Sequence, residues 1–208
     1  MKHYQLPILT IIVICSHWSM GAPEPAVVQG PSLWTANVTF EPLQPLVYQP
    51  NKTVKPRRFW YTILTIVNRT GDDIEFHPKC DLMTDTFQIL PAGKFVPNEV
   101  YGRIKQRHQR KYPLLQTLSE TKPQILQGED NAIDVAIIWS DIDAKAKEVT
   151  LYISGLSNET AVVNLPDTDP QEQVYLRKTL ELNFQLKGDA PWQSDSDILF
   201  KGKRWIMR

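Results

Sequence analysis

Histidine and cysteine are the first residue types to consider for nucleophilic or acid–base chemistry, and the chain has few of either. Of four histidines and two cysteines, His3, His17 and Cys15 lie in an N-terminal leader. His77 and Cys80 are close enough in sequence to suggest a cysteine–histidine pair. On a regular strand, however, residues three apart point to opposite faces, so the two side chains would not meet. We therefore expect Cys80 to be a small core residue and assign no catalytic residue.

Aspartate pairs of the form D-x-D are the second candidate, for a metal ion. Carboxylates in loops at one end of a sandwich could hold Ca²⁺, which takes roughly six to eight oxygen ligands. No complete calcium-loop pattern is present, and aspartate is also common in turns because its side chain bonds the nearby backbone. We therefore expect turns and no cofactor. The pairs lie in predicted loops at Asp141 and Asp143, Asp167 and Asp169, and Asp195 and Asp197. The candidate metal ligands among them are Asp141, Asp143, Asp195 and Asp197.

A basic cluster on one predicted helix is the third candidate. It consists of Arg103, Lys105, Arg107, Arg110 and Lys111. Such a cluster could bind an anionic polymer, a lipid head group or an acidic partner. A helix that docks by a narrow apolar stripe must also expose its other face, where Lys and Arg are ordinary. We expect a solvated face, with Arg103, Arg107, Arg110 and Lys111 as the residues that would contact a partner.

The tryptophans are the fourth candidate, because exposed tryptophans often contact ligands. Trp34 and Trp139 lie on the apolar faces of predicted strands, so we expect both in the core. Trp192 lies in a predicted loop and is the candidate for an exposed contact with a partner.

Alternation of apolar and polar residues predicts the strands that would position these groups. Segment 58–68 is apolar on both faces, so we expect a central strand that is covered on both sides. Segment 74–82 reads as its hairpin partner across the turn at 68–72. The predicted strands are 34–40, 58–68, 74–82, 133–139, 149–153, 174–186 and 200–207.

One helix is predicted, over about 97–112. Pro97 or Asn98 begins it, Glu99 suits the positive end of the helix dipole, and Pro113 ends it. Its inner stripe is formed by Val100, Ile104 and His108, with Tyr101 and Tyr112 beside them. The order of elements predicts an immunoglobulin-like antiparallel β-sandwich of about seven strands with this helix inserted.

The N-terminus has the layout of a secretory signal peptide. Lys2 is followed by an apolar run over 6–15 and by small residues, so we expect cleavage after Gly21 or Ala22. Lipidation of Cys15 is the alternative, which the bulky residues before it disfavour. We expect a signal peptide over 1–22, a proline-rich tether over 23–31 and a single domain over 32–208.

The composition of the mature chain excludes several functions. Removal of Lys2 with the leader leaves 22 basic residues against 23 acidic ones, so the total charge gives no reason to expect nucleic acid. No later apolar run reaches the roughly 20 residues of a transmembrane helix. Cys80 is the one cysteine after the leader, so no intramolecular disulfide can form.

The segment R-F-W-Y-T-I-L-T-I-V-N-R-T-G, residues 58–71, resembles the strand-and-turn signature of a family of uncharacterised secreted proteins from planctomycete-type bacteria. That resemblance implies export and a bacterial source, and it brings no activity, ligand or catalytic residue. Further stretches match in order at 96–100, 136–143, 151–158, 177–184 and 205–208.

Four N-x-T sequons are present, and we expect their asparagines in loops or on polar faces. A eukaryotic secretory route could glycosylate them, whereas the bacterial resemblance implies that they are unmodified. They begin at Asn37, Asn51, Asn68 and Asn158.

These observations predict an exported, periplasmic or extracellular β-sandwich that is not an enzyme. It would serve as an interaction or structural module of the cell envelope, with another envelope protein or a surface polymer as its partner. One alternative is a Ca²⁺-dependent or hydrolytic enzyme that uses the aspartate-rich loops. The other is a binder of anionic polymer or lipid through the basic helix, residues 103–111.

Overall fold

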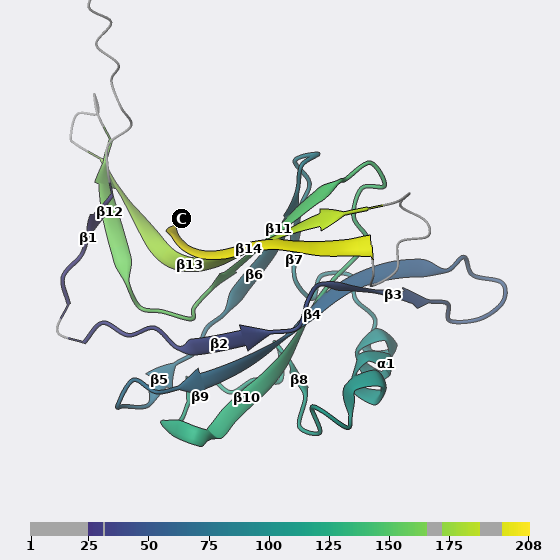
Figure 1. Ribbon diagram of the computed structural model, residues 1–208, viewed down its shortest axis with the longest axis horizontal. Helices are drawn as coiled ribbons and strands as arrows, with labels where there is room; N and C mark the ends of the chain where they lie inside the picture. Colours follow the sequence, from purple (N-terminus) through teal and green to yellow (C-terminus); the bar gives the residue numbers. More distant parts are fainter. Residues whose placement is uncertain (1–24, 31, 166–171, 188–196) are drawn as a thin grey trace, which may run out of the picture.

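The structure is a computed structural model that describes residues 25–30, 32–165, 172–187 and 197–208. Two mainly antiparallel sheets lie over one another, and the helix α1 covers part of the outer face of one of them (Figure 1). The predicted β-sandwich with one inserted helix is therefore confirmed. In chain order the elements are β1 (Ala26–Val27), β2 (Asn37–Phe40), β3 (Gln44–Tyr48), β4 (Arg57–Asn68), β5 (Ile74–Glu75), β6 (Lys79–Thr84), β7 (Ile89–Pro91), α1 (Asn98–His108), β8 (Gln116–Thr117), β9 (Gln124–Ile125), β10 (Gly128–Trp139), β11 (Glu148–Ser154), β12 (Thr160–Asn164), β13 (Gln173–Leu186) and β14 (Ile198–Met207).

The strands form a larger and a smaller sheet. The seven-stranded sheet has the order β1-β12-β13-β11-β6-β7, with β14 on the other side of β13. The five-stranded sheet has the order β2-β4-β10-β8, and β3 also pairs with β4. β5 and β9 form a separate two-stranded pair. All these pairings are antiparallel except the one between β8 and β10.

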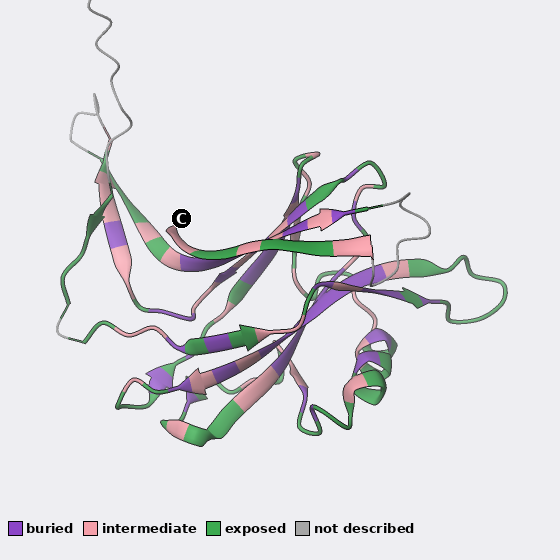
Figure 2. Cartoon of the chain, in the orientation of Figure 1, coloured by how far each residue is buried: buried purple, intermediate pink, exposed green. Residues whose placement is uncertain are grey.

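The strand β4 is central, as its two apolar faces predict. Trp60, Leu64 and Ile66 face the inner core between the two sheets. Phe59 and Tyr61 face a second core on the outer side of the five-stranded sheet, which α1 covers. Figure 2 shows that β4 is buried along most of its length.

The predicted hairpin between 58–68 and 74–82 is wrong. Both edges of β4 are already taken, by β2 and β3 on one side and by β10 on the other. The chain after the turn instead makes the short pair of β5 with β9, and then crosses to the seven-stranded sheet as β6, which pairs with β11 and β7. The crossing occurs at His77 and Pro78, where proline has no N–H to donate to a ladder.

Two strands lie in segments that the sequence assigns to loops. β3 contains Pro45 and pairs on one side only, with β4, as a proline-containing strand must. β12 continues the path of β11 along β13 after a bend. Ala26 and Val27, within the expected tether, also pair with β12. With the short strands β7, β8 and β9, and with 74–82 divided into β5 and β6, these additions bring the seven expected strands to the fourteen of the described residues.

The helix α1 begins at Asn98, as predicted, but ends at His108, so that Arg110, Lys111 and Tyr112 lie in the turn that follows it and not in the helix. Val100 and Ile104 are fully buried against the five-stranded sheet, and Tyr101 and His108 are half-buried beside them. Among the described residues, no helix is long and apolar enough to cross a membrane.

Asn68 does not lie on a polar face or in a loop, contrary to expectation. It ends β4 and is fully buried. Its Nδ2 donates to the carbonyl oxygens of Asp72 at 2.8 Å and Ile125 at 2.9 Å, and its Oδ1 accepts from Thr70. The side chain thus holds the turn after β4, which leaves no room for a glycan in the folded protein. Asn37, Asn51 and Asn158 are exposed, as expected.

Gly155 is required at the bend between β11 and β12. Its φ is +85°, and a Cβ atom there would lie 2.5 Å from the carbonyl oxygen of His77. Gly71 has a φ of +102° but no atom within 4 Å of the position that a Cβ would take, so alanine at Gly71 would introduce backbone strain without a collision.

We expect Gly155→Ala to lower the free energy of unfolding by about 3 kcal/mol, from strain and collision together. Gly71→Ala should cost about 1 kcal/mol, from strain alone. Urea unfolding of both variants would test this, and equal losses would contradict the close approach.

Candidate functional site

His77 and Cys80 do not form a pair. Cys80 is buried in the inner core, whereas His77 is exposed. Burial, helped by the charge of Asp81, raises the pKa of the Cys80 thiol far above its ordinary value. The thiol is therefore protonated and packed, as the sequence predicts.

Asp141 serves as a hydrogen-bond acceptor at the end of the sandwich. Its Oδ1 accepts from Arg58 Nε at 2.9 Å, Trp60 Nε1 at 3.2 Å and the backbone N–H of Ile142 at 3.0 Å. Asp143 Oδ1 accepts from the backbone N–H of Lys145 at 2.9 Å, which is the turn bond expected of aspartate.

Nothing in the described part of the chain brings together three or more His, Cys, Asp or Glu side chains that could hold a metal ion. Asp197 is half-buried at the start of β14, and its carbonyl oxygen accepts from the Lys187 N–H at 2.7 Å. Asp167, Asp169, Asp195 and the candidate contact residue Trp192 lie outside the described residues.

The basic helix directs several of its charges to its own sheet. Arg107 Nη1 donates to the hydroxyl of Tyr61 at 3.1 Å, and Lys111 forms an ion pair with Glu41. The Arg103 guanidinium lies 5.2 Å from the centre of the Tyr48 ring. Arg110 is exposed. Two of the four basic residues predicted to bind a partner, Arg107 and Lys111, are thus tied to β4 and to the chain next to β2.

Tyr61, His108 and Gln44 form a polar group beneath the C-terminal end of α1. The Tyr61 hydroxyl lies 2.8 Å from Gln44 Oε1 and 3.0 Å from His108 Nε2. Next to it, Glu41 accepts from Lys111 and from the Tyr112 hydroxyl, and these two bonds hold the pKa of Glu41 below its usual value. The residue types suit acid–base chemistry, but Tyr61 is fully buried and its hydroxyl meets protein groups.

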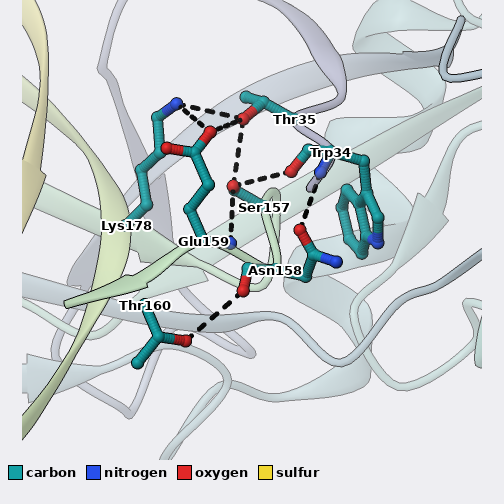
Figure 3. Close-up of polar contacts among 7 residues, drawn as sticks. All are labelled: Trp34, Thr35, Ser157, Asn158, Glu159, Thr160 and Lys178. Carbon is teal, nitrogen blue, oxygen red and sulfur yellow. Dashed lines mark hydrogen bonds and ion pairs between the residues drawn. The ribbon is translucent and has the colours of Figure 1, made fainter. Parts of the chain in front are cut away.

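A second polar group, which the sequence analysis missed, joins the two sheets (Figure 3). It lies where the chain before β2 meets the bend before β12, around the isolated bridge between Thr35 and Ser157. Ser157 Oγ donates to the Trp34 carbonyl oxygen at 2.7 Å and accepts from Thr35 Oγ1 at 3.0 Å. The sequence signal for this group is the S-N-E-T run at 157–160, whose last three residues also form a sequon.

Lys178 completes this group and explains why it is not a serine–lysine catalytic pair. Its Nζ donates to Glu159 Oε1 and, at 3.1 Å, to Thr35 Oγ1. The bond from Lys178, with a further one from Thr35, keeps the pKa of Glu159 below its usual value although burial opposes this. Lys178 is therefore held by the Glu159 carboxylate and by Thr35, so the group serves as a clasp between the sheets.

A pocket of about 500 Å³ opens beside the N-terminal half of α1. Ala136 and Ile138 of β10 form its apolar floor, and Tyr101 of α1 forms part of one wall. The rest of the wall comes from residues 92–98 and 117–120, namely Ala92, Gly93, Val96, Pro97, Asn98, Thr117, Leu118, Ser119 and Glu120.

Two ionisable groups of this pocket have shifted pKa values. Glu120 Oε2 accepts the backbone N–H of Thr117 at 2.8 Å, and this bond is the main reason that the pKa of Glu120 is lowered. Burial, followed by the nearby charge of Glu120, raises the pKa of Tyr101 to about 12. At neutral pH the pocket therefore presents a carboxylate and a neutral phenol above an apolar floor.

Phe95 lies next to the lining residues Val96 and Pro97. It is 71% exposed, and its φ of 60° is in the left-handed region, where a residue with a side chain is strained. Both exposure and strain are unfavourable for the folded chain alone, and residues of this kind gather at functional sites.

Comparison of the chain with protein-family models, with curated proteins and with solved structures found no match.

The Glu159–Lys178 pair gives a test of the clasp. Each partner is about one-fifth exposed, so we expect Glu159→Gln or Lys178→Met to lower the free energy of unfolding by about 1–3 kcal/mol. Because the folded-state pKa of Glu159 is lowered, this contribution is present above the unfolded pKa of about 4.3 and is lost as the pH falls through the folded value.

A double-mutant cycle at pH 7 and at acidic pH would measure this coupling. The exposed Arg69–Glu129 pair is the matched control, and its coupling should be under about 1 kcal/mol. Equal coupling energies for the two pairs would show that the clasp does not depend on its buried charges.

Proposed function

We propose that this protein is an exported, non-enzymatic interaction module of the cell envelope, and that it binds its partner through the pocket beside α1. The observation that carries the proposal is the half-apolar pocket that contains the Glu120 carboxylate, with the strained, exposed Phe95 directly before its lining residue Val96. A stable fold does not need an aromatic side chain at such a position, where glycine would relieve the strain. A role in binding would explain why Phe95 is present, because function often retains residues that lower stability.

The chemistry of the pocket supports a partner group of a particular kind. The floor of Ala136 and Ile138 suits an apolar body, and the ionised Glu120 suits a hydrogen-bond donor or a cation. Such a mixture of apolar surface and a few polar groups is typical of binding pockets. A partner side chain or terminus with an apolar stem and an amino group would satisfy both.

The two alternatives receive less support from the described residues. Asp141 and Asp143 bond to neighbouring backbone and side-chain groups, which argues against a hydrolytic or calcium site built on them. Arg107 and Lys111 are held by Tyr61 and Glu41, which leaves Arg103 and Arg110 as the predicted contacts for an anionic polymer or lipid.

Export is tested by the N-terminus of the mature protein. When the full chain is expressed in a bacterial host, the leader should be removed, because a charged start, a short apolar run and small residues direct signal-peptide cleavage. N-terminal sequencing of the protein from the periplasm or the medium should then begin at Ala22 or Pro23. Protein that keeps Met1 and stays in the cytoplasm would contradict export.

Phe95→Gly tests the pocket. Removal of the strained side chain should raise the free energy of unfolding by up to about 1 kcal/mol. The same change should weaken binding of benzylamine, an apolar ring with a cationic group, followed by the amide NMR shifts of Tyr101, Thr117 and Glu120. Glu120→Gln should weaken it about tenfold, because a charge-assisted bond is lost.

Phe87→Gly is the matched control. Phe87 has a φ of 64° and is 87% exposed but, unlike Phe95, it does not adjoin a residue that lines the pocket. The Phe87→Gly variant should gain similar stability and should bind benzylamine as tightly as the unsubstituted protein. Benzoate, which reverses the probe's charge, should bind more weakly than benzylamine. Equal binding of the two probes, or an equal effect of the two glycine variants, would contradict the proposed site.

A further inference from the structure

The strand β14 has a free edge, whose backbone is regular from Gly202 onward, after a shift of register against β13 between Asn183 and Phe184. Arg208 N–H donates to Arg177 O at 3.1 Å, and Arg177 N–H donates back to Arg208 O at 2.9 Å, so these residues form a hydrogen-bonded pair of the antiparallel ladder. Counting back by two, Ile206 and Arg204 also bond toward β13, as their register with Thr179 and Glu181 requires. Lys203, Trp205 and Met207 therefore direct their N–H and C=O groups outward. Within the part of the chain that the structure describes, no strand pairs with that edge.

The edge is strongly basic. Residues 198–208 contain Lys201, Lys203, Arg204 and Arg208 and no acidic residue. Lys203 and Arg204 point to opposite faces of the sheet, because successive residues of a strand alternate. Arg204 is ion-paired with Glu181 and Arg208 with Asp81, whereas Lys201 and Lys203 form no ion pair with the described residues, so these two lysines supply the positive charge beside the free edge.

The side chain of Lys203 reaches from β14 to β2 of the other sheet. Its Nζ donates to the carbonyl oxygen of Val38 at 2.9 Å and lies 5.9 Å from the centre of the Phe40 ring. This bond occupies a carbonyl group of β2, the neighbouring edge strand of the other sheet. Of the two edge strands β2 and β14, β14 is therefore the one whose outward N–H and C=O groups remain free to pair with another strand.

The same charges oppose pairing of two copies of this chain. Antiparallel pairing of β14 with itself would place the basic residues of one copy against those of the other, and like charges across a ladder are destabilising. Lysine on an edge strand is a common protection against such self-association. An extended segment with carboxylates at alternate positions would instead meet complementary charges while it completes the ladder.

We propose that β14 is a docking edge for an extended acidic segment of another protein, which adds to the seven-stranded sheet as a further strand. This proposal is independent of the pocket beside α1. Either site can fail its test without affecting the other.

Hydrogen exchange of the intact protein gives a direct test. The probe is a short peptide of alternating glutamate and valine, blocked at both ends. At saturating peptide, exchange of the Lys203, Trp205 and Met207 amides should slow by about tenfold or more, because they gain hydrogen-bond partners. The Arg204 and Ile206 amides, already in the β13 ladder, serve as internal controls and should change little. The same peptide N-methylated throughout has no backbone donors and should give no protection.

Charge variants test the electrostatic part. Lys201→Gln with Lys203→Gln keeps a donor for Val38 and should weaken peptide binding about fivefold at low salt. Lys52→Gln with Lys55→Gln removes the same charge from an exposed loop and should have no effect. Full binding of the N-methylated peptide would overturn strand addition, since charge alone would then explain it. Absence of protection at the three outward amides would show that the basic edge serves only to prevent self-association.

Discussion

The strand β4 has no polar face to turn toward water, and the rest of the architecture depends on that. Its inner side chains are covered by the seven-stranded sheet, and its outer ones require a second cover, which α1 supplies. Each large apolar side chain that is fully buried contributes about 1.5–3 kcal/mol, so an uncovered face would be very costly. The helix has 11 residues and is therefore about 16 Å long, so it covers only part of the outer face of the five-stranded sheet. The pocket lies where this cover ends, over Ala136 and Ile138 of β10.

Polar side chains join these layers, and most of their hydrogen-bonding groups are engaged in these contacts. Asp141 accepts three N–H groups at one end of the sandwich, Asn68 holds the turn after β4, and the Glu159–Lys178 clasp closes the gap between the sheets. Asn68 is buried and the Glu159–Lys178 pair is about one-fifth exposed, and polar groups that satisfy one another in such places fix a unique arrangement. They are then unavailable for chemistry, which is why the pocket, and not these groups, supports the proposed function.

Local patterns predicted the elements well and their partners less well. The strands over 133–139, 149–153 and 174–186 and the helix were recognisable, because each alternates or repeats with a clear period. The hairpin after β4 failed because pairing depends on which edges are already occupied, and β10, which occupies one edge, lies about sixty residues away. Cys80 and Asp141 could be assigned structural roles from residue type. The pocket could not be predicted, because 92–98, 117–120 and β10 meet only in the folded chain. The left-handed backbone of Phe95 carries no sequence signal, since the residue itself is atypical of that conformation.

The connection between the two ends of the chain has a consequence for the order of folding. Thr35 bonds Ser157, 122 positions away, and Lys203 bonds the carbonyl of Val38, 165 positions away. Contacts of such long separation slow folding, because a long loop must close before they form. The contact between β2 and β14 cannot form until β14 is available, so β2 waits for a strand that follows it by about 160 positions. A chain with this topology therefore completes its sandwich only after segments more than 120 positions apart have met.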